Sequence, residues 1–280
     1  MQNKNKLYLI ISIVSFLIVL IALLAIGVLL FSYKQSGDDY AQLAQEARVE
    51  TTAAQSAATE ATEETVPTEP PLVDIPIDFG YLKEQNEDII GWITVDGTII
   101  DYPILYDSSN ILYYLKHNYV GTATDYGSIF VLSENADDFT DFNTLVYGHN
   151  MLDGQMFAQL HKFREKSFFD EHGQILIYTP DRKLTYQVFA AYRTDNLNII
   201  VNNDFSTEEL REAYIERIYT HTDYAFFKPE YPVTASDRIV TLSTCIANPD
   251  YRYVVQGVLV SDEPGEFTPA HTTDEDISES

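Results

Sequence analysis

An uninterrupted apolar run near the N-terminus divides this chain before any other pattern is considered. Residues 7–31 read LYLIISIVSFLIVLIALLAIGVLLF and hold no charged residue. A helix needs roughly 20 apolar residues to cross a bilayer, whereas the apolar core of a cleaved signal peptide is only about 7–15 residues long. The sequence therefore predicts a transmembrane helix over residues 7–32, with a signal peptide as the alternative.

Charges on either side of this run predict its orientation. Lys4 and Lys6 precede it, and Asp38 and Asp39 follow it. Positive charge is retained on the cytoplasmic side of a membrane. We therefore expect a single-pass plasma-membrane protein with residues 1–6 in the cytoplasm and everything after the helix outside the cell.

Two acidic segments flank the globular part of the chain. Residues 33–75 are rich in Ala, Thr and Glu and end near PTEPP, which predicts a flexible tether. Residues 40–50 could add a helical stretch that would be marginal in isolation. Residues 263–280 are acidic as well, which predicts a disordered tail. The net charge of −26 would repel phosphate backbones, so we expect no nucleic-acid partner.

The remaining residues, 76–262, have the pattern of one mainly β domain. Short runs rich in β-branched and aromatic residues are bounded by Gly, Pro, Asn or Asp and predict strands; they lie at 98–106, 127–132, 143–148, 174–179, 184–192, 238–244 and 252–260. Helices are expected at 78–93, at 154–169 and at 206–221, where Ser206 and Glu209 have capping-box spacing. Many short strands with few helices predict a closed or nearly closed β-barrel.

Cys245 is the only cysteine, so the fold contains no internal disulfide. It ends the apolar run RIVTLSTC, where it has two readings: a small buried hydrophobic residue, or a thiolate nucleophile at an exposed strand end. One cysteine cannot form a thiolate zinc site, and no histidine pair has metal-ligand spacing. We therefore expect no metal and no cofactor.

His149 is the candidate base, because the run LVYGH places it at a strand end, as with Cys245. Surface positions are expected for His117, His161, His172 and His221, and His271 falls in the acidic tail. Arg252 opens the next strand, and the two strands read as a hairpin that returns Arg252 to Cys245. There it could hold an oxyanion, or it could simply pair with Asp250 at the surface.

These residues carry a family resemblance. TLSTC followed by Arg252, with YGHNM upstream, resembles the sortases, the cysteine transpeptidases of Gram-positive bacteria. The stretches LKEQNEDIIGWITVDGTIIDYPI and HNYVGTATDYGSIF, and the helix before the last two strands, are similar to class B sortases. The resemblance covers roughly residues 76–261 and implies a sortase-like closed barrel of about eight strands with a few peripheral helices.

The resemblance also implies roles. Cys245 would attack the carbonyl of a Thr in a C-terminal sorting signal of the Asn-Pro-x-Thr type and form a thioester. His149 would serve as acid and base, in a thiolate–imidazolium pair, and Arg252 would stabilise the oxyanion. An amine of a peptidoglycan precursor or of a protein would then resolve the thioester. Thr244, Ser243 and Asn150 are the candidate substrate-binding residues, and the enzyme class would be that of cysteine peptidases.

The sequence differs from the sortase subclasses at two places, and two alternative functions stay open. The region VDIPIDFGY lacks the Asp-Pro-aromatic lid of class C sortases, and no second apolar run ends the chain, which argues against class C. The segment between Cys245 and Arg252 is short for class B. The rivals are a cysteine peptidase or peptidoglycan hydrolase with water as acceptor, and a non-catalytic membrane-tethered scaffold.

Overall fold

The computed structural model describes residues 2–49, 71–196, 199–246, 248 and 250–269. The chain forms two units, residues 1–43 and residues 44–280. Helix α1 (Gln2–Glu46) provides the first unit and the start of the second. It includes a segment, Ile10–Glu46, that is long and apolar enough to cross a membrane, with a mean hydropathy of 3.3 in its most apolar window.

Helix α1 does not end at residue 32, where the sequence suggested that a tether begins. It continues to Glu46, because residues 40–47 (YAQLAQEA) are mostly strong helix formers. The stretch expected to be marginal in isolation thus extends an existing helix and needs no nucleation of its own. The greater part of the predicted tether, residues 50–70, lies outside the described residues.

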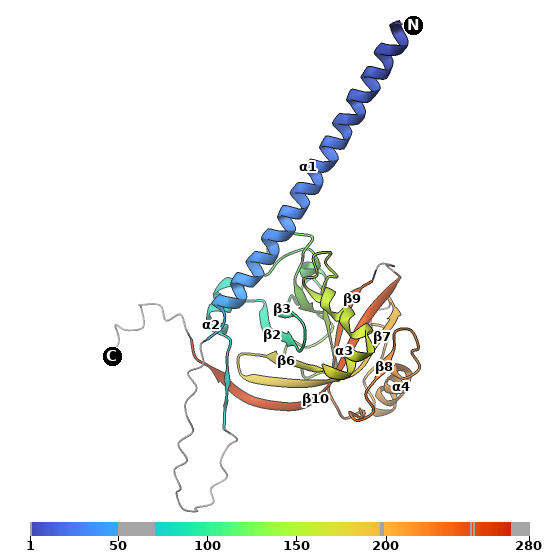
Figure 1. Ribbon diagram of the computed structural model, residues 1–280. Helices are drawn as coiled ribbons and strands as arrows, with labels where there is room; N and C mark the ends of the chain where they lie inside the picture. The colour runs from blue at the N-terminus through green and yellow to red at the C-terminus, as the bar shows by residue number, and fades with distance from the viewer. Residues whose placement is uncertain (1, 50–70, 197–198, 247, 249, 270–280) are drawn as a thin grey trace, which may run out of the picture. The chain divides into compact units, whose positions relative to one another are not determined.

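The second unit is built around a closed ring of eight strands, as predicted (Figure 1). Their order around the ring is β10-β9-β5-β4-β3-β2-β6-β7, and antiparallel pairing of β7 with β10 closes it. The strands are β2 (Ile89–Val95), β3 (Asp101–Tyr106), β4 (Ile129–Val131), β5 (Asn143–Tyr147), β6 (Gln174–Tyr178), β7 (Arg182–Asp195), β9 (Ile239–Cys245) and β10 (Tyr251–Phe267). The short strand β8 (Phe226–Phe227) adds to β7.

One predicted helix is wrong over half its length. The expected helix at 78–93 ends early as α2 (Phe79–Gln85), with Asp78 as its N-cap and Asn86, in an extended conformation, as its C-cap. The residues after it form β2, in which Ile89, Trp92 and Ile93 are fully buried. Burial on both sides of a barrel strand removes the alternation that would have identified it.

The other helices are shorter than expected. Residues 154–169 form a 3-10 helix, η2 (Phe157–Arg164), and α3 (Lys166–Glu171), separated by extended backbone at Glu165. Helix α4 (Glu208–Ile218) is capped by Thr207 rather than by Ser206, since the Thr207 side chain accepts from the Leu210 N–H. A further 3-10 turn, η1 (Tyr113–Leu115), precedes β4.

Helix α4 is docked on the outer face of the barrel by both apolar and polar contacts. Tyr214, Ile215 and Ile218 pack against a cluster that includes residues of β7, β9 and β10. The Tyr214 hydroxyl, within this layer, accepts from Asn143 Nδ2 at 3.1 Å and from Gln256 Nε2 at 2.9 Å. Buried hydrogen bonds of this kind fix a single arrangement of the helix on the sheet.

The domain expected at 76–262 extends beyond these bounds at both ends. Strand β1 (Val73–Ile75) pairs in parallel with the end of β10, Val73 opposite Gly265. β10 itself runs to Phe267, so residues 263–267 are strand rather than tail. An acidic composition did not prevent pairing there, because a neighbouring strand takes up the backbone hydrogen bonds. Residues 270–280 lie outside the described residues.

Candidate active site

Cys245 and Arg252 lie directly opposite each other on neighbouring strands. Cys245 is the last residue of β9, and the antiparallel register pairs it with Arg252 near the start of β10. Directly paired residues of a sheet have side chains on the same face. The predicted hairpin is therefore confirmed, and it brings a thiol and a guanidinium together.

His149 reaches the same edge of the sheet through a parallel pair of strands. Tyr147, the last residue of β5, is in register with Ser243 of β9. The ladder continues one step further, because the Gly148 N–H donates to the Ser243 carbonyl at 3.2 Å. His149 thus follows the end of the β5 ladder at the same offset that Cys245 has on β9.

All three side chains line one cleft of about 310 Å³. Apolar residues and the ends of β5, β9 and β10 form its walls, and its lining comprises Ile111, Leu112, Leu115, Phe130, Leu132, Tyr147, Gly148, His149, Asn196, Ser243, Thr244, Cys245 and Arg252. A mostly apolar cleft with a few converging polar groups is the usual form of a binding site.

The imidazole of His149 is held by the segment that precedes β4. His149 Nε2 lies 2.7 Å from the Leu115 carbonyl oxygen. A carbonyl can only accept, so Nε2 carries the proton in this contact and Nδ1 is the nitrogen left for chemistry. Gly127 closes over the ring: a Cβ placed there would lie 2.9 Å from His149 Cδ2.

Tyr147 places a neutral phenol beside the thiol and the guanidinium. Burial raises the pKa of Tyr147 to about 12, although the positive charge of Arg252 opposes that rise. Its ring stacks on Phe130 across the β4–β5 pair, with centroids 5.9 Å apart. Tyr147 is therefore a hydrogen-bond donor at neutral pH on the wall of the cleft.

The predicted substrate-binding residues fall into two groups. Ser243 and Thr244 line the cleft but are almost fully buried, and the Thr244 hydroxyl donates to the Gly148 carbonyl at 2.9 Å. Thr244 therefore ties β9 to the residue before His149. Asn150 is exposed and is not among the residues that line the cleft.

The other described histidines, for which surface positions were expected, are only partly exposed. His117, His161, His172 and His221 are all partly buried, and each contacts an aromatic ring. His161 also lies 3.1 Å from the Cys245 carbonyl oxygen, through Nε2. His161 has polar sequence neighbours, so its burial could not be predicted from the sequence. Helix η2 presents alternate sides to solvent and to the barrel. His271 lies outside the described residues.

Sequence reasoning also missed several parts of the cleft. The Leu115 carbonyl, Tyr147 and Asn196 come from three separate segments. Tyr147 opens the stretch YGHNM but was given no role, and no motif marks the other two. An aromatic residue at a strand end was the only available signal, for Tyr147. Among the residues that the structure describes, no group of three or more His, Cys, Asp or Glu could hold a metal ion.

A closed barrel that gathers a thiol, an imidazole and a guanidinium in one cleft has the fold and the groups of a cysteine transpeptidase. The family model described as the sortase domain matches residues 93–260, more than half of the chain. The chain therefore belongs to the sortase family, whose members are cysteine transpeptidases that sort proteins to the cell wall.

Within that family its relatives are B-type sortases. The chain is 38% identical over 183 residues to sortase B of Listeria monocytogenes, an alignment that covers 64% of this chain and 73% of that protein. It is 32% identical over 167 residues to sortase B of Staphylococcus aureus, covering 60% and 67%.

Solved structures agree with this assignment. Sortase B from Bacillus anthracis in complex with AAEK1 matches with a TM-score of 0.66 and 31% identity, covering 83% of this chain and 99% of that one. The Staphylococcus aureus sortase B–substrate complex matches with a TM-score of 0.59 and 30% identity, covering 65% and 84%.

Proposed function

We propose that this protein is a membrane-anchored transpeptidase that cleaves a sorting signal after Thr and transfers the acyl group to an amine. The observation that carries the proposal is the convergence of Cys245, His149 and Arg252 on one apolar cleft. Cys245 is the nucleophile, His149 the acid and base, and Arg252 the donor to the oxyanion.

In the first half-reaction the Cys245 thiolate attacks the Thr carbonyl carbon and forms a C–S bond. Negative charge moves to the carbonyl oxygen, where the Arg252 guanidinium donates to it. The peptide C–N bond then breaks, and the leaving amine takes a proton from His149. Because Nε2 is held by the Leu115 carbonyl, the proton that moves is the one on Nδ1.

In the second half-reaction an amine attacks the thioester and gives its proton back to His149. The C–S bond breaks and the thiolate is restored, so atoms and charges balance over the cycle. Ile111, Leu112 and Leu115 line the cleft and limit access of water, which favours an amine over hydrolysis. The acceptor is an amine of a peptidoglycan precursor or of a protein.

We further propose an Asn-Pro-x-Thr type of signal and a cell-surface location. The B-type relatives support the Asn-Pro-x-Thr signal. Helix α4 supports it as well, because it packs against a cluster that includes Ile239 of β9, the strand that carries Cys245. One of those relatives was solved as a substrate complex. Helix α1 supports the second, with Lys4 and Lys6 on the cytoplasmic side and residues 44–280 outside the cell.

The test uses the full chain in detergent micelles and fluorescent peptides with and without an added amine. Wild-type protein should cleave an Asn-Pro-x-Thr peptide and form the amide product when an amine is present. Cys245→Ala should abolish cleavage, and His149→Ala should nearly do so, without loss of the folded state by circular dichroism.

Three outcomes would contradict parts of this proposal. Cleavage by Cys245→Ala would show that Cys245 is not the nucleophile. Hydrolysis that no amine diverts would make the protein a cysteine peptidase. Good cleavage of Leu-Pro-x-Thr-Gly peptides, with no cleavage of Asn-Pro peptides, would show that the proposed type of sorting signal is wrong.

A further inference from the structure

The carbonyl of Cys245 lies where its strand has lost a neighbour. The Ser243 carbonyl accepts from Gly148 in the β5–β9 ladder. Carbonyls two residues apart on a strand point to the same side, so the Cys245 carbonyl also faces the β5 side. β5 has ended by then, at Tyr147, and the chain has turned away to place His149.

A side chain takes the place of the missing strand. His161 Nε2 lies 3.1 Å from the Cys245 carbonyl oxygen, and because that oxygen can only accept, Nε2 is the donor. Nδ1 of the same ring is buried with no hydrogen-bond partner among the described residues. Burial lowers the pKa of His161, which favours the neutral ring with its proton on Nε2.

The helix that carries His161 also holds the backbone of His149. The N–H of Phe157, the first residue of η2, donates to the His149 carbonyl at 2.9 Å. Phe157 and His161 are four residues apart on one short helix, so a single element contacts both backbones. Met156, just before η2, has a φ of 53°, a strained value that persists only where the surrounding structure enforces it.

We propose that His161 is a positioning residue, and that η2 sets the separation between Cys245 and His149 by binding the carbonyl of each. This inference rests on the roles proposed for those two residues. Loss of the His161 donor frees the end of β9, so the thiol is held less well against the imidazole and the scissile carbonyl. Peptide binding by the rest of the cleft is unaffected.

The test compares two amides at position 161 in the full chain. A Gln side chain carries its N–H at about the reach of Nε2, whereas an Asn side chain is one methylene shorter. We expect His161→Asn to lower kcat for peptide cleavage about 10-fold, the loss of one hydrogen bond of about 1.4 kcal/mol, with KM within twofold. His161→Gln should keep kcat within threefold of the wild type.

A matched control separates this from a loss of packing. His172 is also partly buried, packs with its ring tilted against Phe168 and lies within hydrogen-bond distance of Asp96. It has no contact with Cys245, so His172→Asn should leave kcat unchanged. Wild-type kcat in His161→Asn, or an equal loss in both amides, would overturn the inference. If His161→Asn does not fold, His161→Gln still tests the inference, because any loss of turnover greater than threefold in that variant overturns it. Cleavage by Cys245→Ala would instead refute the proposed function.

Discussion

Arg252 is the residue for which the two possible roles differ most in what they predict. As a surface ion-pair partner it would contribute only about 0–1 kcal/mol, and any cation would serve. As an oxyanion donor it needs its planar fork, which the flexible ammonium of lysine cannot reproduce. Its position opposite Cys245, in the wall of the cleft, favours the second role.

We therefore expect Arg252→Lys to reduce turnover about 10²-fold, the usual cost of losing an oxyanion donor. The melting temperature should change little, because the charge is kept. Peptide cleavage and thermal unfolding should be measured on the same preparation. Turnover within a few-fold of the wild type would show that Arg252 is only a surface ion-pair partner.

Gly127 provides a second test, directed at His149. Its φ is +61°, and a Cβ there would meet the Leu115 carbonyl oxygen at 2.8 Å and His149 Cδ2 at 2.9 Å. Gly127→Ala should therefore displace the imidazole and lower turnover by on the order of 10- to 10²-fold, besides the cost of about 1–2 kcal/mol for a left-handed residue.

Gly121→Ala is the control for that backbone cost. Gly121 has a similar φ of +77°, but a Cβ there would meet only the Tyr113 hydroxyl, at 3.4 Å. Gly127→Ala should lose more stability than Gly121→Ala in urea unfolding, because its Cβ also meets a backbone oxygen. Only Gly127→Ala should lose activity per folded molecule. Equal activity in the two would show that Gly127 does not support His149.

How far the cleft could be read from sequence depends on the separation of its parts. The pairing of Cys245 with Arg252 followed from a local hairpin. The neighbourhood of His149 and Cys245 needed the parallel β5–β9 pair, which no short-range pattern specifies. The contact of His149 with the Leu115 carbonyl could not be predicted, because it involves a backbone group. The contact of His161 with Cys245 could not be predicted either, because it depends on how η2 packs.

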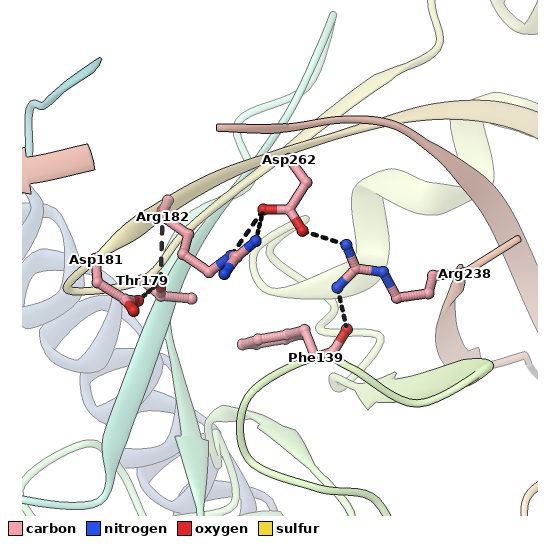
Figure 2. Close-up of polar contacts among 6 residues, drawn as sticks. All are labelled: Phe139, Thr179, Asp181, Arg182, Arg238 and Asp262. Atoms are coloured by element: carbon pink, nitrogen blue, oxygen red, sulfur yellow. Dashed lines mark hydrogen bonds and ion pairs between the residues drawn. The ribbon is translucent and has the colours of Figure 1, made fainter. Parts of the chain in front are cut away.

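At the scale of elements, one carboxylate joins three segments of the barrel. Figure 2 shows Asp262 of β10 between Arg182, at the start of β7, and Arg238, which immediately precedes β9. Arg238 also reaches the Phe139 carbonyl at 3.4 Å, in the loop before β5. Burial raises the pKa of Asp262, but its bonds to both arginines outweigh burial, so the net shift is downward.

Asp262→Asn should lower the free energy of unfolding by about 2 kcal/mol at neutral pH, the usual worth of hydrogen bonds to a charged group. The folded-state pKa lies below the unfolded one, so this stabilisation is complete above about pH 3.9 and is lost as the pH falls towards the folded value. Urea unfolding at pH 7 and at pH 3 should show the difference between variant and wild type shrink.

An exposed ion pair provides the comparison. Lys166 and Asp170 lie four residues apart on α3, at the surface, so Asp170→Asn should change stability little at either pH. A difference for Asp262→Asn that stays constant down to pH 3 would show that packing, rather than charge, accounts for its effect.

Elements were predictable where one rule decided them. The strands predicted at 143–148 and 238–244 are short runs of mainly apolar and β-branched residues, and the structure has them almost residue for residue. At 78–93 the predicted helix start at Asp78 was correct, but the helix was wrongly extended into the residues that form β2. Ile89 fits both a helical spacing and a buried strand, and only tertiary packing against β3 and β6 chooses between them.

At the scale of the whole molecule, the barrel depends on pairs that are distant in sequence. β3 with β4, β5 with β9 and β1 with β10 are all parallel, and parallel neighbours need long connections. Composition and strand count could indicate a barrel, but they could not say which strands adjoin. The family resemblance implied a closed barrel of about eight strands, and the pairs themselves come from the structure.

The same long-range pairing sets the limits of the part that folds on its own. A fragment that begins at residue 76 loses β1, including Ile75, which is fully buried. It also loses the bond from the Asp78 N–H to the Ala47 carbonyl, 2.8 Å, and the Arg48–Asp101 pair. The domain therefore begins before the boundary that the composition break suggests.

We expect residues 44–280 to fold and cleave peptide without detergent, and residues 76–280 to be less stable by about 3 kcal/mol, from lost burial and hydrogen bonds. Residues 71–280, which regain β1, should fall between them in urea unfolding. Activity per folded molecule should be equal in all three, because every residue of the cleft follows residue 110. Equal stability of the three fragments would show that the N-terminal contacts are dispensable, and activity found only for the full chain in detergent would show that α1 is part of the working enzyme.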